Sequence, residues 1–153
     1  MENLKLVIFQ LGGENYGIDI KLVSAIEKVH KTVPIPGSIS FIKGIMKLRG
    51  GVIPVCSLRN KFGLEEVENT DDTKYLVIRA NNREIALAVD SVDEIHDIDT
   101  EDSFEAPDII KSQKTRYVEK IVSVGENLVV MLNTNNLLTE EEAENIVKII
   151  ESH

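Results

Sequence analysis

Tryptophan is absent from this 153-residue chain, and cysteine and histidine are scarce. The single Cys56 excludes an intramolecular disulfide framework and a multi-cysteine zinc site. Because Cys56 lies in an apolar run, we expect it to act as a small buried hydrophobe in a reducing, cytosolic setting. The three histidines, His30, His96 and His153, have no second ligand-type residue at helical zinc spacing. The sequence therefore carries no metal-site signature.

Long hydrophobic runs are also missing. No apolar stretch approaches the roughly 20 residues needed to span a bilayer. The opening MENLKLVIFQLGG has an acid at position 2 and an apolar segment too short and too interrupted for a signal peptide. We therefore expect neither export by that route nor membrane insertion, and a cytoplasmic location.

Motifs of catalysis and phosphate binding are lacking as well. There is no Walker A sequence and no HExxH, and the glycines of LGGENYG precede no helix. Ser57 has no activating base nearby in sequence, and a role as a helix N-cap explains it without chemistry. The acidic run DEIHDIDTEDSFE, residues 93–105, lacks the glycine that bends an EF-hand loop, so we interpret it as a solvated acidic loop. The sequence predicts no enzyme and no cofactor.

The net charge of −9 is unevenly distributed. Residues 1–64 carry nine Lys and Arg against four acids, a net of +5, and the remaining residues carry −14. A basic first half suits an acidic protein partner, whereas an acidic second half would repel nucleic acid. Solubility and attraction between the halves explain the same distribution equally well.

Short strands separated by turn signals dominate the chain, and three adjacent pairs predict hairpins. The pairs are LKLVIFQL with YGIDI, YLVIRA with IALAVD, and KIVSV with LVVMLN. The glycines and asparagines between them supply the positive φ that such reversals need. With GIMKL and VIPV there are about nine strand candidates, a mainly β pattern that suits small barrels or a sandwich.

Two helical segments are predicted. The stretch SLRNKFG favours a short turn that Ser57 caps and Gly63 ends. A capping box of Thr139 and Glu142, followed by apolar residues at one-face spacing, predicts a C-terminal helix over 140–152 that docks on the β structure.

The polar stretch LEEVENTDDTK, residues 64–74, has little to bury and is predicted to be an exposed connector. It is the best internal boundary that the sequence offers. Within one domain over 1–153, we expect an approximate first barrel over 14–64 and a second over 74–138, with the N-terminal strand available for sharing between them.

A small barrel that binds nucleic acid is the rival hypothesis, because such barrels use basic grooves lined with stacked aromatics. The chain has only seven aromatic residues, and Phe9, Phe41 and Phe62 occupy predicted core positions instead of an exposed platform. A β scaffold that binds other proteins through strand edges and grooves fits the composition better.

Several motifs follow one another over nearly the whole chain: FQLGGENYGIDI (9–20), FIKGIMKLRG (41–50), VIPVCSLRNKFG (52–63), LAVDSVDEI (87–95), APDII (106–110) and LVVMLNTNNLL (128–138). In their order and spacing they resemble the CheW family, the adaptors that couple the CheA histidine kinase to chemoreceptors in bacterial chemotaxis. The resemblance implies two packed, SH3-like barrels of five strands each and no enzymatic activity. It also implies two partners, the CheA regulatory domain and the tips of methyl-accepting receptors, at receptor arrays.

The resemblance also suggests site residues. The arginine of the family's LRG motif is associated with receptor binding, so Arg49, together with Val23, Ile26 and Leu48, is expected to line a receptor groove. The competing interpretation of Arg49 is a solvated turn residue. Ile109, in APDII, is expected to be an apolar anchor for the kinase, and core burial explains it equally well.

This chain departs from the family pattern at two positions. Ala25 stands where the family often has Glu, so an acidic receptor contact at that position cannot be transferred. Ser57 stands where the family often has Asp, and both residues are good N-caps, so the physical role is kept. No receiver or kinase segment lies within the 153 residues, which favours a stand-alone adaptor.

Overall fold

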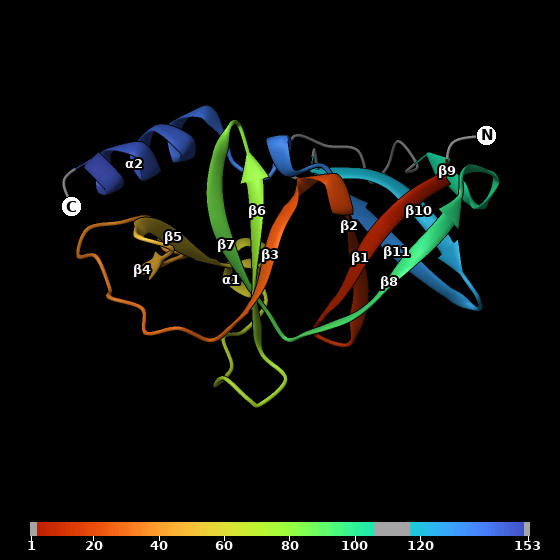
Figure 1. Ribbon diagram of the computed structural model, residues 1–153, viewed down its shortest axis with the longest axis horizontal. Coiled ribbons are helices and arrows are strands. Elements are labelled where there is room, and N and C mark those ends of the chain that lie inside the picture. Colours follow the sequence, from red (N-terminus) through yellow and green to blue (C-terminus); the bar gives the residue numbers. More distant parts are fainter. Residues whose placement is uncertain (1–2, 106–116, 152–153) are drawn as a thin grey trace.

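The computed structural model describes residues 3–105 and 117–151, and strands dominate both ranges. The strands form two sheets, one of six and one of five strands, that lie beside each other along the long axis of the molecule (Figure 1). The prediction of a mainly β fold with few helices is confirmed. The sheets differ from the expected five strands each, because a short edge strand is added to one of them.

The six-stranded sheet has the order β8-β1-β2-β11-β10-β9. Its strands are β1 (Asn3–Leu11), β2 (Glu14–Asp19), β8 (Ser91–Asp99), β9 (Ser103–Glu105), β10 (Val118–Val124) and β11 (Asn127–Leu132). The five-stranded sheet has the order β3-β6-β7-β5-β4. Its strands are β3 (Val23–Lys28), β4 (Ile42–Leu48), β5 (Gly51–Ser57), β6 (Lys74–Ala80) and β7 (Arg83–Val89). The helical segments are η1 (Ile20–Leu22), α1 (Leu58–Lys61), η2 (Thr100–Asp102), η4 (Thr134–Asn136) and α2 (Glu140–Glu151).

All three predicted hairpins form, as β1–β2, β6–β7 and β10–β11. Their turns use the expected positive φ, including 54° at Asn81 and 64° at Asn82. Asparagine tolerates this left-handed conformation better than most residues with a side chain. Local turn chemistry therefore sets these pairings.

The two sheets do not divide at the connector that the sequence suggested. Residues 64–72 are exposed as expected, but the strands on both sides of them, β5 and β6, belong to the same sheet. The chain instead passes from one sheet to the other at two places: at η1, between β2 and β3, and at Asp90, between β7 and β8. Parallel pairing of β2 with β11 and of β5 with β7 joins segments far apart in sequence. The expected ranges 14–64 and 74–138 therefore each contribute strands to both sheets.

The acidic run over 93–105 is not a loop: it comprises most of β8, the short helical turn η2 and all of β9. β8 pairs with β1 along its length, with one register shift, and its Ile98 side chain is buried. The side chains of Asp93, Glu94 and Asp97 are exposed, so these acids remain in contact with water although they belong to a strand. Pairing with a neighbouring strand overrides the low β propensity of these acids.

Buried side chains form three clusters, because alternate residues of a strand face opposite sides of its sheet. The central core lies between the sheets and includes Val7, Phe9, Leu11, Ile18, Leu76, Ile78, Ile85, Leu87, Cys56 and Ile146. The second cluster, on the other side of the six-stranded sheet, is Leu6, Ile8, Ile98, Val122, Val129 and Met131. The third cluster, on the other side of the five-stranded sheet, is Met46, Val55, Tyr75, Val77 and Ala86.

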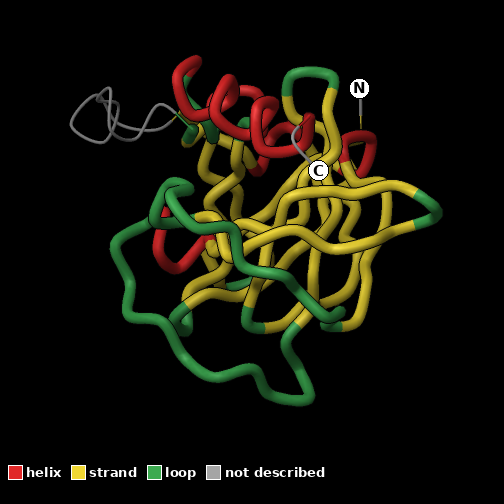
Figure 2. Tube along the Cα trace, turned by 90° about the vertical axis from the view of Figure 1, so that its left-hand side faces the viewer, coloured by secondary structure: helices red, strands yellow, loops and turns green. Residues whose placement is uncertain are grey.

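Both predicted helices are present with their caps. Ser57 accepts the Asn60 N–H at 3.1 Å at the start of α1, and Gly63 has a φ of 77° just after its end. Thr139 and Glu142 bond reciprocally, at 3.1 and 2.8 Å, at the start of α2. Helix α2 lies along one side of the strands (Figure 2) and inserts Ile146 into the central core.

Candidate functional site

Val23 and Ile26 lie on β3, an end strand of the five-stranded sheet. Their cross-strand partners on β6 are Ile78 and Leu76, both members of the central core. Residues directly opposite each other share one face of a sheet. Val23 is accordingly half-buried against the central core, whereas Ile26 on the same strand is 43% exposed. This face of β3 offers an apolar contact at the border between the two sheets.

Arg49 occupies the first position of the two-residue turn between β4 and β5. Its φ is 50° and that of Gly50 is 80°, the pattern of a type I′ turn. A left-handed conformation costs a residue with a Cβ about 1–2 kcal/mol, and asparagine or glycine is the usual choice. The Arg49 side chain is exposed at the tip of the hairpin. A strained, exposed backbone position of this kind makes Arg49 a candidate functional residue.

Leu48 belongs to a different face from Val23 and Ile26. It packs against the third cluster, whose Val77 alternates along β6 with residues of the central core. Ala25 packs against the same third cluster, so it too faces away from Val23 and Ile26. The structure thus separates the predicted receptor residues into a β3 pair and a hairpin pair. Sequence spacing could not reveal this separation.

An open groove of about 740 Å³ lies at the crossing between the sheets, and its lining includes Leu22, the residue before Val23. It is lined by Leu4, Lys5, Asp19, Ile20, Lys21, Leu22, Glu119, Lys120, Met131, Asn133 and Asn135. The groove combines apolar side chains with three lysines, in a protein whose net charge is −9. Asp19 in this lining already has a hydrogen-bond partner, because its carboxylate accepts the Lys21 N–H at 3.0 Å. Such a lining can hold an amphipathic segment that carries acidic side chains.

Sequence reasoning missed this groove, because its walls come from β1, η1, β10 and β11. The parallel pairing of β2 with β11 brings these segments together, and no local pattern predicts that pairing. Ile109, the expected kinase anchor, lies in 106–116, outside the described residues.

Among the described residues, no group of three or more His, Cys, Asp or Glu could hold a metal ion. In the same part of the chain, no helix has the length and apolar character needed to cross a membrane. Cys56 is buried, and burial raises the pKa of its thiol to about 12. A thiol with so high a pKa is a poor nucleophile at neutral pH.

Comparison with known proteins agrees with this architecture. Residues 5–142 match the CheW-like domain. The chemotaxis protein CheW of Klebsiella aerogenes is 30% identical over 149 residues, which cover 97% of this chain and 90% of that protein. CheW of Bacillus subtilis is 29% identical over 143 residues, which cover 94% of this chain and 92% of that protein.

The fold is similar to a solved structure as well. The crystal structure of the scaffolding protein TtCheW from Thermoanaerobacter tengcongensis matches with a TM-score of 0.84 and 29% identity, covering 92% of this chain and 96% of that one. Both the sequence match and the fold extend over nearly all of the chain, which therefore belongs to the CheW family.

Proposed function

We propose that this protein is a non-enzymatic adaptor of bacterial chemotaxis that links chemoreceptor tips to the regulatory domain of the CheA histidine kinase. In this role it works in the cytoplasm, at receptor arrays. The observation that carries the proposal is the family match over residues 5–142, joined to a fold shared with a scaffolding protein. An adaptor needs binding surfaces and no reaction centre, which suits a chain without a catalytic motif.

Receptor binding is assigned to the face of β3 and to the β4–β5 hairpin. Val23 and Ile26 present apolar surface on one face of β3, in the manner of a site that accepts an amphipathic helix. Arg49, exposed beside Leu48, is available to pair with an acidic residue of the same partner. These two patches lie on different faces, and β3 and β4 are the strands at the two ends of the five-stranded sheet, so a receptor tip that contacts both must reach both ends of the sheet.

Kinase binding is assigned to the second half of the chain, with Ile109 as an apolar anchor. An apolar anchor at an interface contributes through burial, so Ile109→Asp should weaken binding to the kinase domain strongly. If Ile109 instead belongs to the core, the same substitution will lower the free energy of unfolding. A melting curve recorded beside the binding assay separates these two roles.

The sharpest test of the receptor assignment is Arg49→Glu. The substitution replaces a charge-assisted donor with a carboxylate that repels an acidic partner, at a cost of roughly 2–5 kcal/mol in a desolvated contact. Because the side chain is exposed, the free energy of unfolding should change by no more than about 1 kcal/mol. Receptor-tip binding should collapse in a pull-down, while binding of the CheA regulatory domain persists.

Arg83→Glu is the matched control, since Arg83 is an exposed arginine beside another two-residue turn of the same sheet. It should leave both interactions intact. Normal receptor binding by Arg49→Glu would return Arg49 to the role of a solvated turn residue. Tight retention of single-stranded DNA at physiological salt, with no kinase binding, would favour the nucleic-acid hypothesis instead.

A further inference from the structure

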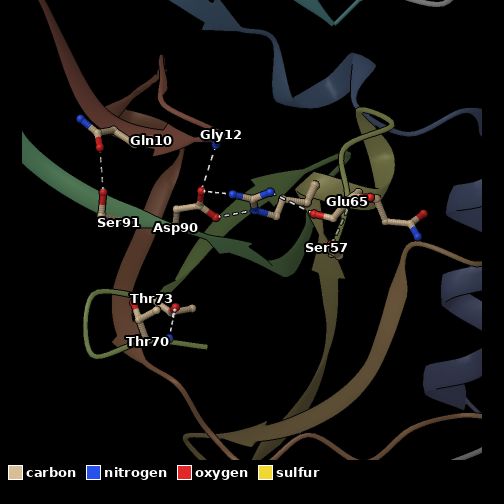
Figure 3. A network of polar contacts seen from close by, with 10 residues as sticks. Gln10, Gly12, Ser57, Glu65, Thr70, Thr73, Asp90 and Ser91 are labelled. Carbon is tan, nitrogen blue, oxygen red and sulfur yellow. Dashed lines mark hydrogen bonds and ion pairs between the residues drawn. The ribbon is translucent and has the colours of Figure 1, made fainter. Parts of the chain in front are cut away.

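Asp90 is the single residue between β7, in the five-stranded sheet, and β8, in the six-stranded sheet. Its backbone N–H donates to the Gln10 carbonyl oxygen of β1 at 3.0 Å. Its Oδ2 accepts the Gly12 N–H, just past the end of β1, at 2.9 Å (Figure 3). Backbone and side chain together therefore attach Asp90 to one end of the six-stranded sheet.

Arg59 approaches Asp90 from the other sheet. It belongs to α1, which follows β5 directly. Its Nε donates to Oδ1 at 2.8 Å and its Nη2 donates to Oδ2 at 2.6 Å, a two-bond fork. Its Nη1 donates to the Glu65 carbonyl oxygen at 2.9 Å, which also ties the guanidinium to the exposed connector. All the guanidinium nitrogens of Arg59 are thus engaged.

We infer that Arg59, Asp90 and Gly12 form an inter-sheet clamp, in which Arg59 is the positioning residue that fixes the orientation of the two sheets. A bidentate guanidinium–carboxylate contact is directional, whereas burial in the central core depends little on direction. At the other crossing, among the described residues, the Asp19 carboxylate accepts the N–H of Lys21, two residues along, so this contact stays local. A neutral hydrogen bond also joins the sheets, from Thr134 Oγ1, beyond β11, to the Arg79 carbonyl oxygen of β6 at 2.9 Å. The charged, two-bond contact between Arg59 and Asp90 is more directional than this single neutral bond.

The electrostatics of the pair support a persistent contact. The hydrogen bond from Arg59 holds the pKa of Asp90 below its usual range, and the same bond raises the pKa of Arg59. Both groups therefore stay charged at neutral pH. The side chains are mostly sheltered, with 17% of Arg59 and 27% of Asp90 exposed, which reduces screening by salt.

The test is a distance distribution between spin labels on the two sheets, measured by pulsed electron paramagnetic resonance on the full chain. Exposed Arg79 on β6 and exposed Glu126 in the β10–β11 turn are replaced by cysteine for labelling. Cys56 is buried and has a thiol pKa of about 12, so it does not compete for the label. If the clamp fixes the orientation of the sheets, the distance distribution should be narrow in the chain that carries only the two labelling substitutions.

Arg59→Lys keeps the positive charge but cannot form the fork, and Asp90→Asn removes the carboxylate. Both should broaden the distance distribution, Asp90→Asn more strongly. Glu142→Gln is the control, because it removes the 2.6 Å ion pair between Lys61 of α1 and α2 but leaves the contacts of Arg59 and Asp90 in place. That variant should keep the narrow distribution.

Distributions as narrow as that of the parent in both variants, with only lowered stability, would overturn the inference and leave Arg59 as an ordinary stabilising residue. If Asp90→Asn does not fold, the width of the Arg59→Lys distribution alone decides whether Arg59 acts as a clamp or as an ordinary stabilising residue. The consequence for signalling rests on the proposed function: each partner should still bind singly, while assembly of both on one adaptor weakens. Because the label distances need no partner, failure of the clamp and failure of the adaptor role give different results.

Discussion

Arg49 adopts a left-handed backbone conformation at a turn position where asparagine is normally favoured. Arg49→Asn should relieve part of this cost and raise the free energy of unfolding by about 0.5–1 kcal/mol. The same substitution removes the guanidinium, so receptor-tip binding should weaken as stability rises. Urea denaturation paired with a binding titration measures both effects. A less stable Arg49→Asn protein would contradict the account of the turn.

Asp90 gives a second prediction at this scale, through the pH dependence of folding. Its pKa is lowered in the folded protein, mainly by the Arg59 hydrogen bond, whereas in the unfolded chain it is near 3.9. The folded state thus binds this proton more weakly, so the stabilisation is present above the unfolded pKa and is lost as pH falls through the folded one. Asp90→Asn should cost roughly 1.5–3 kcal/mol at neutral pH.

Urea denaturation at about pH 7 and about pH 3 checks this sign. The parent chain should lose more free energy of unfolding on acidification than Asp90→Asn does, so the two should converge at low pH. Parallel pH profiles would mean that the Asp90 carboxylate does not contribute through its ionised form.

At the scale of the element, α2 packs Ile146 into the central core, with Ala143 and Ile150 partly buried beside it, and an ion pair joins it to α1. Ile146 is 1% exposed, and Glu142 pairs with Lys61 of α1 at 2.6 Å. Ile146→Ala should cost roughly 2–5 kcal/mol and speed hydrogen exchange in the α2 amides. Glu144→Ala, on the exposed side, is the control and should cost little. An Ile146→Ala cost below about 1 kcal/mol would show that α2 is not anchored there.

Elements with local signals were predictable and those with long-range partners were not. The Thr139–Glu142 capping box predicted α2, and Asn81 with Asn82 predicted the β6–β7 turn. β8 escaped prediction because its exposed acids, among them Asp93, resemble a loop in composition. Its strand character comes from β1, more than 70 residues earlier in the chain.

For the whole molecule, the hairpin pattern was sufficient to predict the mainly β class, and the ordered segments from FQLGGENYGIDI to LVVMLNTNNLL were sufficient for the family resemblance. The division into sheets was not predictable, because β2 pairs with β11 and β3 pairs with β6 across long stretches of chain. The candidate site follows the same rule. Val23, Ile26, Leu48 and Arg49 were expected to line one receptor groove, and that role stays a prediction. The structure places Val23 and Ile26 on one face of β3, whereas the lysine-containing groove depends on long-range pairing.

The central claim is that one adaptor holds two different partners at once. Size-exclusion chromatography with light scattering, on this chain mixed with a CheA regulatory domain and a receptor-tip fragment, tests it most directly. We expect one complex whose mass equals the sum of all three components, with Arg49→Glu losing only the receptor fragment. Two partners that displace each other, or that both fail to bind the folded chain, would contradict the account.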